Sequence, residues 1–348
     1  MRQADMRHEI TVRECATPRH TTRYLAAGLA DGPLIVFVHG WPELAVSWRH
    51  QIECFAALGF RVVAPDMRGY GGSTVHTACA DYAMAQVVQD MVELLAHLGR
   101  DKAIWVGHDW GSPVVWSMAS HHAEKCLGVA NLCVPYLPRG FTLDSLLPLV
   151  DRNVYPQALY PAGQWDYQCH YQESFEAARA ALEADPLRTV KALMRSGDPE
   201  GRGKPYRTAT MRRDGGWFGG AGIAPDLPRD PAVLSEEALA EYADRLRCNG
   251  FFGPDAWYMN MERNAAFAAA APDAGRLAVP VLFLHAAFDW ICETRDSQLA
   301  SPMRALCSDL SEAVVDSGHW MQQEQPERVN ACLATWIARR IDLEERTA

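Results

Sequence analysis

The chain has 348 residues and a formal net charge of −10, from 33 lysines and arginines against 43 aspartates and glutamates, which disfavours a nucleic-acid partner. Its 49% of hydrophobic and 22% of charged residues are ordinary for a globular protein, and its length allows a large core. No run approaches the roughly 18 uninterrupted apolar residues of a membrane helix, so we expect no membrane span.

The cysteines and the first residues bear on the cellular compartment. The ten cysteines show no C-x-x-C spacing, which favours reduced thiols over a disulfide framework. The opening run, MRQADMRHEI, lacks the apolar core of a signal peptide. We therefore expect a cytoplasmic protein.

The first part of the chain alternates strand-like and helix-like segments, which indicates an α/β fold with a largely parallel sheet. Residues 34–38, LIVFV, form a continuous apolar run of buried-strand length. Further strand-like runs are found at residues 60–64, 103–106 and 127–134. Between them, residues 83–98 repeat apolar side chains at three- and four-residue steps, which predicts a helix that stops at Gly99.

After Pro135 the strand signals stop. Residues 139–269 have helical or irregular patterns, and residues 215–231 are crowded with glycine and proline. Within this region Ser235 has the features of an N-cap and Gly250 those of a helix stop. A helical insertion is the simplest interpretation.

The alternation returns in the last part of the chain. Strand signals lie at residues 281–284 and 313–315, and a helix is predicted at residues 327–341. We therefore expect an α/β core made of residues 1–138 and 270–348, interrupted by a helical domain at residues 139–269.

The run VGHDWGS lies between a predicted strand and a helix-like segment. Gly107 and Gly111 hold the glycine positions of G-x-S-x-G, the nucleophile elbow of α/β-hydrolases, with Asp109 in place of the serine. A carboxylate at this turn is suited to attack a saturated carbon, which forms an alkyl ester on the enzyme. The motif predicts the α/β-hydrolase fold with Asp109 as the nucleophile.

In this fold the catalytic residues follow in the order nucleophile, acid, histidine. His319 follows Gly318 in a loop between the last strand and the last helix, where a neutral imidazole can act as a general base. Asp289, just beyond a predicted strand, is favoured as the acid that orients it. Asp316 is the competing candidate, but so close a neighbour in sequence seldom forms this pair in the fold.

The run HGWPE, residues 39–43, follows the first strong strand. The oxyanion hole of this fold uses one backbone N–H just after the nucleophile and one from an earlier strand-end loop, and Trp110 and Trp41 are the candidates. His39 is expected to support the loop rather than to act as the base. Four histidines in polar helical contexts are expected at the surface: His50, His121, His122 and His170. No histidine pair has metal-ligand spacing, so we expect no metal.

Together, five motifs resemble those of the α/β-hydrolase-fold epoxide hydrolases, over about residues 20–340. The motifs are HGWPE (39–43), RGYGGS (68–73), GHDWGS (107–112), FDWI (288–291) and SGHW (317–320). The resemblance extends into the insertion, where WDYQCHYQE and FFGPDAWYMNMERN are similar to the two lid-tyrosine segments of the family. It implies lid tyrosines at Tyr167 and Tyr258, with Tyr171 as a nearby alternative for the first.

The resemblance implies a mostly parallel sheet flanked by helices, with an inserted helical lid, and hydrolysis of a small apolar epoxide by water. Asp109 would attack a ring carbon, while Tyr167 and Tyr258 hydrogen-bond the epoxide oxygen and one of them donates a proton. His319, oriented by Asp289, would then activate the water that hydrolyses the ester. The product is a vicinal diol, and no cofactor is implied.

Two alternatives remain open. A haloalkane or haloacid dehalogenase shares the fold and the nucleophile but needs groups that stabilise a halide, a role open to Trp110. Haloalkane enzymes usually carry Asn in place of Trp41, haloacetate enzymes usually carry Arg in place of Trp110, and a tyrosine pair suits an epoxide oxygen better. A non-catalytic ligand-binding member of the fold would not require the set of nucleophile, base and acid. The sequence does not name the epoxide or its selectivity, and it leaves a monomer and a homodimer equally open.

Overall fold

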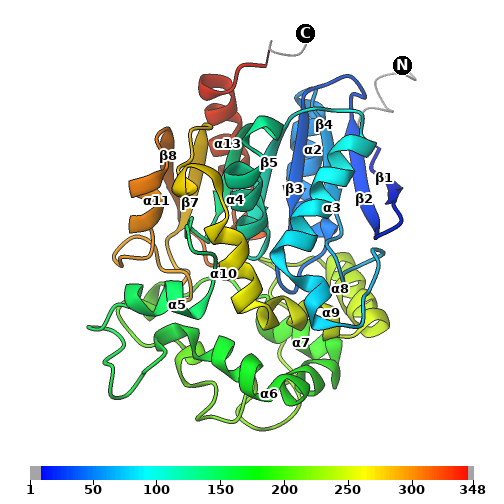
Figure 1. Cartoon of the computed structure of the whole chain (residues 1–348). Helices are drawn as coiled ribbons and strands as arrows, with labels where there is room; N and C mark the ends of the chain where they lie inside the picture. The colour runs from blue at the N-terminus through cyan, green and yellow to red at the C-terminus, as the bar shows by residue number, and fades with distance from the viewer. Residues whose placement is uncertain (1–8, 344–348) are drawn as a thin grey trace.

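The computed structural model describes residues 9–343, and at its centre lies one sheet (Figure 1). In chain order, the strands of the described residues are β1 (Thr11–Ala16), β2 (Thr21–Gly28), β3 (Leu34–Val38), β4 (Arg61–Pro65), β5 (Ala103–His108), β6 (Cys126–Leu132), β7 (Val281–Ala286) and β8 (Leu310–Val315). They are arranged in the order β1-β2-β4-β3-β5-β6-β7-β8. β2 is antiparallel to both neighbours, and all neighbouring pairs from β4 to β8 are parallel. The expected mostly parallel sheet is confirmed. Residues 1–8, which carry most of the expectation about a signal peptide, lie outside the described residues.

The apolar runs of the sequence account for the middle of this sheet. β3 and β5 are buried along their whole length, because helices cover both faces. Each expected strand is present within a few residues of its predicted bounds. The pair β1–β2 was not predicted, because in β1 most side chains are exposed and no continuous apolar run marks it.

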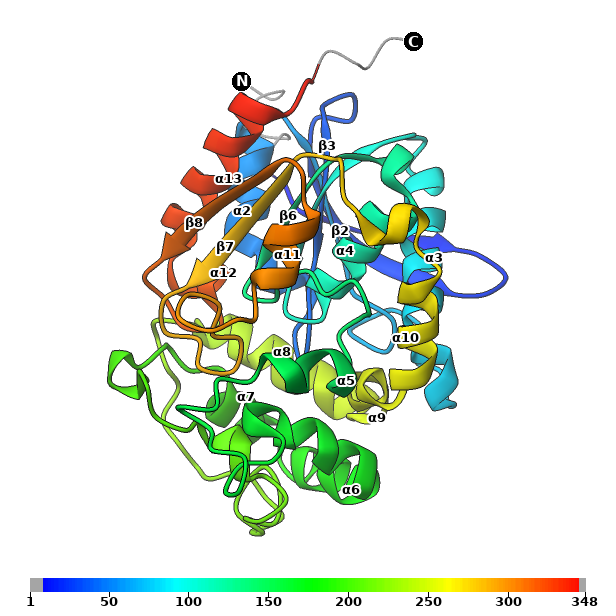
Figure 2. The ribbon, with the colours of Figure 1, turned by 60° about the vertical axis from the view of Figure 1, so that its left-hand side comes forward.

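Helices cover the two faces of the sheet (Figure 2). One face carries α2 (Arg49–Ala57) and α13 (Pro326–Arg340), which follows the short α12 (Met321–Glu324), and the other carries α3 (Met84–His97), α4 (Gly111–His121) and α11 (Ser301–Leu306). Side chains of β3 alternate between the two cores: Ile35 and Phe37 pack with α2 and α13, whereas Val36 and Val38 pack with α3 and α4. α3 ends as predicted, with Gly99 in the left-handed region at a φ of +66°.

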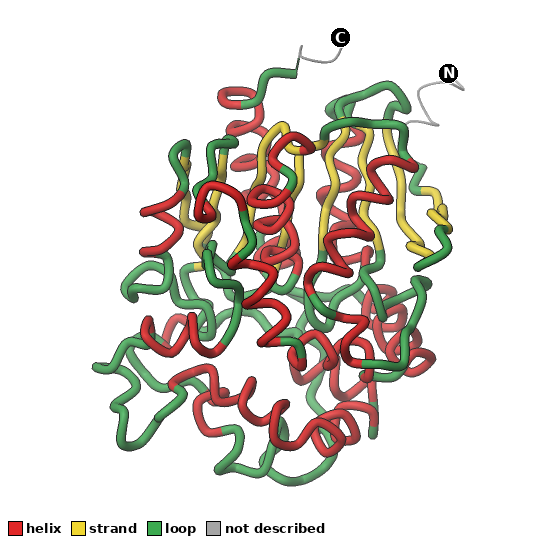
Figure 3. The backbone as a smooth tube through the Cα atoms, viewed as in Figure 1, coloured by secondary structure: helices red, strands yellow, loops and turns green. Residues whose placement is uncertain are grey.

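A helical layer, formed from residues 139–269, lies against the carboxyl ends of the parallel strands, while the last helix of this segment packs along α3 and the end of α4. Figure 3 shows helices and loops there, with all strands in the other part of the molecule. Its α-helices are α5 (Leu143–Leu146), α6 (Asp166–Glu183), α7 (Pro186–Leu193), α8 (Glu236–Asn249), α9 (Phe252–Ala256) and α10 (Met261–Ala269). The hydroxyl of Ser235 accepts a hydrogen bond from the backbone N–H of Ala238 at 3.1 Å, and Gly250 ends α8 with a φ of +69°, both as predicted.

One histidine differs from its expected environment. His170 is only 7% exposed, so its predicted surface position is wrong. The glycine-rich segment covers it: a Cβ atom added at Gly216 would lie 3.1 Å from its Nε2. His50, His121 and His122 are partly exposed. Among residues 9–343, no helix combines the length and the apolar character needed to cross a membrane.

Candidate active site

Asp109 occupies the turn between β5 and α4, at the carboxyl end of the sheet. Its φ of +47° lies in the left-handed region, which side chains other than glycine rarely adopt. The flanking glycines are required by close contacts: a Cβ at Gly107 would lie 2.6 Å from the Gly111 carbonyl oxygen, and one at Gly111 would lie 2.1 Å from that of Val38. This sharp turn projects the carboxylate beyond the ends of the strands.

Two backbone N–H groups adjoin the Asp109 carboxylate. The N–H of Trp41 donates to Oδ1 at 2.6 Å. The N–H of Trp110 is close by, because a Cβ at Gly40 would lie 2.4 Å from Asp109 Oδ1 and 2.6 Å from Trp110 N. Gly40 therefore leaves the space beside the carboxylate and the backbone nitrogen of Trp110, and of the two expected donors the N–H of Trp41 already hydrogen-bonds the carboxylate.

His319 and Asp289 are brought together from separate loops. Nδ1 of His319 lies 2.6 Å from Oδ2 of Asp289, and Oδ1 of Asp289 accepts hydrogen bonds from the backbone N–H groups of Ile291 and Cys292. Asp289 is 2% exposed, whereas the competing Asp316 is at the surface. The geometry thus pairs His319 with the favoured acid.

His319 lies between two carboxylates, since its Nε2 is 3.4 Å from Oδ2 of Asp109. Burial disfavours the imidazolium, but the charge of Asp289 and hydrogen bonds to both aspartates raise the pKa of His319 well above its ordinary value. Burial likewise opposes the charged form of Asp289, yet the charge of His319 lowers the pKa of that carboxyl group. Both shifts favour an ion pair between His319 and Asp289, with Asp109 on the other side of the imidazole ring.

A second buried pair lies behind His319, and the sequence reasoning did not single it out. Nδ1 of His108 is 2.7 Å from Oε2 of Glu43, and both side chains are fully buried. Nε2 of His108 hydrogen-bonds the carbonyl oxygen of His319 at 2.7 Å, and Gln322 donates to Oε1 of Glu43 at 2.7 Å. Burial opposes the charge on His108, but Glu43 raises its pKa to about 10. The charged pair supports the loop that carries His319.

A sequence signal for this pair did exist. Glu43 and His108 are ionisable residues inside HGWPE and GHDWGS: His108 is the last residue of β5, and Glu43 lies in the loop that follows β3. Neighbouring parallel strands end at the same edge, so two such residues are candidates for a buried contact. His39 has the supporting position expected for it: Nδ1 hydrogen-bonds the Gly40 carbonyl oxygen, and Nε2 accepts the N–H of Met67.

Three side chains at the site could in principle ligate a metal. His108, Cys133 and His319 bring ligand atoms within 4.8 Å of one another. Both ring nitrogens of His108 are engaged, however, by Glu43 and by the His319 carbonyl oxygen, and Nδ1 of His319 is engaged by Asp289. A metal would have to break these bonds, so the cluster fits hydrogen bonding better than ligation.

Tyr167 of α6 and Tyr258, just after α9, lie next to each other in the wall of the cavity that Asp109 also lines. Their ring centroids are 5.7 Å apart at an interplanar angle of 81°, and both side chains line the same cavity as Asp109. The Tyr167 hydroxyl accepts from Gln168 Nε2 at 3.3 Å, and among the described residues neither phenol donates to an acceptor. Burial raises the pKa of both tyrosines well above the ordinary value, so both stay protonated. The site therefore has two unused O–H donors.

Tyr171, the alternative to Tyr167, has a different environment. Its ring stacks on Tyr258 with centroids 4.5 Å apart and an interplanar angle of 9°, and its hydroxyl accepts from Nε1 of Trp217 at 3.1 Å. It is fully buried and does not line the cavity. Tyr171 thus packs behind the tyrosine pair.

The cavity has a volume of about 310 Å³, within the usual range for small-molecule sites. Asp109, Asp289 and His319 line it together with side chains that are largely apolar or aromatic. The main members of this second group are Trp41, Tyr167, Leu193, Trp217, Tyr258 and Phe288. Its wall also includes the charged side chains of Arg195, Asp198 and Arg207, so the cavity fits a small ligand that is largely apolar and can carry a polar group.

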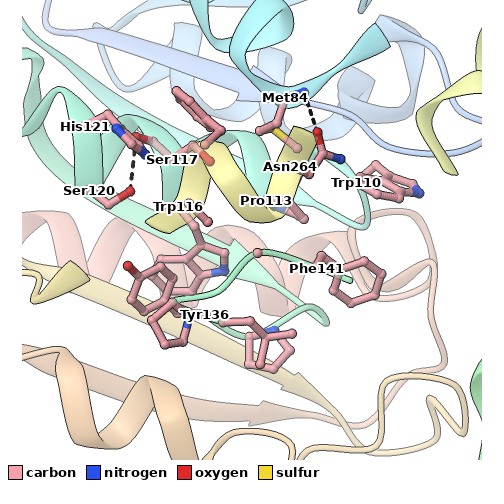
Figure 4. A pocket seen from close by; sticks show the side chains of 16 residues that line it. Met84, Trp110, Pro113, Trp116, Ser117, Ser120, His121, Tyr136, Phe141 and Asn264 are labelled. Atoms are coloured by element: carbon pink, nitrogen blue, oxygen red, sulfur yellow. Dashed lines mark hydrogen bonds between the residues drawn. The ribbon is translucent and has the colours of Figure 1, made fainter. Parts of the chain in front are cut away.

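The indole of Trp110 is directed elsewhere. It lines a separate, smaller pocket together with Phe141 and Asn264, the latter accepting the backbone N–H of Met84 at 2.8 Å (Figure 4). Its Nε1 is buried without a hydrogen-bonding partner among the described residues. Trp41 Nε1, in turn, donates to Asp255 at 2.9 Å. Neither indole N–H is available to a ligand beside Asp109.

Comparisons with known proteins agree with this arrangement. A family model described as the alpha/beta hydrolase fold matches residues 33–326. Epoxide hydrolase A of Mycobacterium tuberculosis is 35% identical over 321 residues, which cover 90% of this chain and 93% of that protein. The chain belongs to the epoxide hydrolase family of the α/β-hydrolase fold.

Two further comparisons extend this result. The crystal structure of epoxide hydrolase A from Mycobacterium thermoresistibile has a TM-score of 0.79 at 31% identity, covering 97% of this chain and all of that one. The bifunctional epoxide hydrolase 2 of Sus scrofa is 33% identical over 313 residues. The match covers 89% of this chain but 52% of that relative, so the chain spans about half of its length.

Proposed function

We propose that the protein hydrolyses an apolar epoxide to a vicinal diol through an alkyl ester on Asp109. The observation that carries this proposal is a single cavity lined both by the Asp109 carboxylate and by two phenols, Tyr167 and Tyr258, that donate no hydrogen bond among the described residues. Ring opening needs a nucleophile at carbon and an acid at oxygen, and this cavity supplies both. Membership of the epoxide hydrolase family supports the same reaction.

In the first half-reaction, a carboxylate oxygen of Asp109 forms a bond to a ring carbon. The C–O bond of the ring breaks, and its electron pair moves to the epoxide oxygen. Tyr167 and Tyr258 hydrogen-bond this oxygen, and one of them transfers its proton. Such acid assistance contributes roughly 10²–10⁴-fold to the rate. The result is a hydroxyalkyl ester and a phenolate.

Formation of the ester also allows His319 to become the neutral base that the second half-reaction needs. It converts the Asp109 carboxylate into an ester, and the hydrogen bond to that carboxylate is one of the influences that raise the pKa of His319. The imidazolium then returns a proton to the phenolate, which restores the phenol and leaves His319 neutral. Asp289 keeps the ring oriented through its 2.6 Å contact with Nδ1.

In the second half-reaction, neutral His319 takes a proton from water, and the hydroxide attacks the carbonyl carbon of Asp109. The backbone N–H groups of Trp41 and Trp110 stabilise the tetrahedral oxyanion, and loss of one such donor typically costs roughly 10²–10³-fold in rate. The alkoxide leaves with the proton from His319, and the new carboxylic acid of Asp109 gives its proton to that imidazole. The starting charges are restored and the diol is released.

The helical layer, residues 139–269, is proposed to act as a lid domain over a core of residues 1–138 and 270–348. The position of Tyr167 and Tyr258 supports this division, because both belong to the helical layer while Asp109 and His319 belong to the core. A lid that carries the acids excludes water from the first half-reaction.

The dehalogenase alternative is weaker than the epoxide proposal. A leaving halide needs N–H donors beside the carboxylate, but the Trp110 indole lies in another pocket and the Trp41 indole is bonded to Asp255. A halide also leaves without taking up a proton, so a dehalogenase does not require two phenol donors. A non-catalytic binding protein is disfavoured by the ordered contacts of His319 with Asp109 and Asp289.

For partners, we propose a small apolar epoxide and water, in a cytoplasmic protein that is either a monomer or a homodimer. The cytoplasmic assignment is supported by the cysteines, all ten of which are free thiols. The largely apolar cavity wall supports the class of substrate.

Diol formation tests the proposal. The purified chain would be incubated with aromatic, terminal and fatty-acid epoxides and, in parallel, with haloalkanes and haloacetate, followed by chiral analysis of diols and detection of halide. We expect diols and no halide. Release of halide without diol formation would replace the epoxide proposal by the dehalogenase.

The nucleophile is tested by Asp109→Ala, which should abolish diol formation while leaving the folded state intact by circular dichroism. The exposed Asp316→Ala is the matched control and should retain full activity. Diol formation by Asp109→Ala at the wild-type rate would overturn the scheme.

A further inference from the structure

Asp255 is a buried carboxyl group in the lid that the reaction scheme does not use. It lies on α9, three residues before Tyr258, and has no exposed surface. Oδ1 accepts the indole N–H of Trp41 at 2.9 Å, and the hydroxyl of Tyr171 also interacts with this carboxyl group. Among the described residues, Oδ2 has no partner at good hydrogen-bonding geometry. Burial raises the pKa of Asp255 well above its ordinary range, so the group is a neutral acid.

Such a group is costly for the fold. A buried polar atom without a partner forfeits its hydration, and an apolar side chain of similar size would avoid this cost. The hydrogen bond to the Trp41 indole offsets only a small part of this free-energy cost. A role beyond stability is the physical reason to keep an acid at this position.

Trp41, the partner of Asp255, is part of the oxyanion hole. Its backbone N–H donates to Asp109 Oδ1 at 2.6 Å, while its side chain extends toward the lid. The indole stacks on Trp217, with ring centroids 5.2 Å apart. It makes an edge-to-face contact with Tyr258, with ring centroids 6.1 Å apart. Among residues 9–343, Asp255 is the one hydrogen-bonding partner of this indole N–H, so the bond helps to fix the rotation of a ring that is also packed against Trp217 and Tyr258.

The segment that carries Asp255 is itself firmly attached to the core. A Cβ at Gly253 would lie 2.8 Å from the Cα of Gly69, so the backbones of these two segments are in direct contact. Nε1 of Trp257 donates to the Arg68 carbonyl oxygen at 3.2 Å. Asp255 therefore offers Trp41 a fixed acceptor.

We propose that Asp255 is a positioning residue, which holds Trp41 from the lid side so that the backbone N–H of Trp41 stays aligned with the Asp109 carboxyl group during ester hydrolysis. The inference rests on the proposed function, because it assigns Asp255 to the second half-reaction. Among the described residues, neither of the two phenols that assist ring opening hydrogen-bonds Asp255 or the indole N–H of Trp41. Loss of the contact therefore slows hydrolysis of the ester more than its formation.

The test uses Asp255→Leu, which removes the acceptor, and Asp255→Asn, which keeps a carbonyl oxygen for the indole. Rapid quenching followed by mass spectrometry of the intact protein gives the rates of ester formation and of ester hydrolysis. For Asp255→Leu we expect hydrolysis to slow about tenfold, a part of the roughly 10²–10³-fold lost when an oxyanion-hole donor is removed. Ester formation should stay within about twofold of wild type.

Two further results are expected. Asp255→Asn should restore the hydrolysis rate, and the Tm of Asp255→Leu should equal or exceed that of the wild type, which a merely structural role would not produce. The control is Glu183→Gln, because Glu183 accepts the backbone N–H of Phe251 beside α9 without touching Trp41. This control should leave the hydrolysis rate unchanged.

Trp41→Phe removes the same hydrogen bond from the other side while keeping the backbone N–H, so it serves if Asp255→Leu does not fold. It should also accumulate ester, and the double variant with Asp255→Leu should be no slower than the slower single variant. Unchanged ester hydrolysis in Asp255→Leu, or an equal loss in both half-reactions with a lower Tm, would overturn the inference. Failure of the wild type to turn over any epoxide would instead overturn the proposed function.

Discussion

Nδ1 of His108 lies 2.7 Å from Oε2 of Glu43, and neither side chain reaches solvent. The contact places a second histidine–carboxylate pair behind the pair of His319 and Asp289. The two are joined through the carbonyl oxygen of His319, which accepts a hydrogen bond from His108 at 2.7 Å. The loop that carries His319 is thus held at two points: the His319 side chain bonds Asp289, and the His319 backbone carbonyl bonds His108.

This relationship predicts a pH-dependent loss of stability in Glu43→Gln. The pKa of His108 is raised from 6.5 to about 10, chiefly by Glu43 against the effect of burial, so its contribution is complete below pH 6.5 and is lost as the pH rises through about 10. Removing one partner of a buried pair typically costs about 3–5 kcal/mol. The difference in unfolding free energy from wild type should be of this size near pH 6.5 and should shrink toward pH 10 in urea titrations.

Glu312→Gln is the control for this measurement. Glu312 lies 2.9 Å from Nε2 of His285, but its side chain is 31% exposed. Pairs near the surface contribute about 0–1 kcal/mol, so this variant should stay close to wild type. A Glu43→Gln variant as stable as wild type at pH 6.5 would show that the buried pair is not charged.

His319→Gln is expected to trap the alkyl ester. Asp109 can still open the ring with the two phenols, but no base remains to activate water. Mass spectrometry of the intact protein after incubation with an epoxide should show an increase equal to the mass of the substrate. The same experiment on the double variant with Asp109→Ala should show no increase, and any adduct there would place the ester on another residue.

Because Tyr167 and Tyr258 can both assist ring opening, we expect each to compensate in part for loss of the other. Changing either Tyr167 or Tyr258 to Phe should leave part of the activity, because the other phenol remains, whereas the double variant should lose roughly 10²–10⁴-fold in rate. Steady-state diol formation measures the effect. Tyr171→Phe is the control, since its hydroxyl accepts from Trp217 outside the cavity, and it should remain active. A fully active double variant would show that the epoxide oxygen is protonated by another group.

The acid partner of His319 is decided by comparing two aspartates. Asp289→Ala should lower turnover by up to about 10⁴-fold, because the imidazole loses the group that fixes its orientation. Asp316→Ala should have no effect, since that side chain is exposed. Equal losses in the two variants, measured as kcat for diol formation, would contradict the assignment from geometry.

The sequence by itself determined the central strands, the reactive loops and the family. Strands such as β3 and β5 were predictable because a strand buried on both faces must be apolar throughout. Asp109 was predictable because its turn requires glycines at fixed neighbouring positions, which leave a recognisable motif. Such local constraints lie within a few residues and can be read along the chain.

Contacts between distant segments were decided only by the tertiary structure. The edge strand β1 has no apolar run and is held by hydrogen bonds to β2. His170 has polar neighbours in sequence but is covered by a loop more than forty residues away, at Gly216. The contacts of Glu43 with His108 and of Trp41 with Asp255 join segments 65 and 214 residues apart. Whether such a polar group is buried, and which partner it finds there, depends on how distant segments of the chain pack against each other.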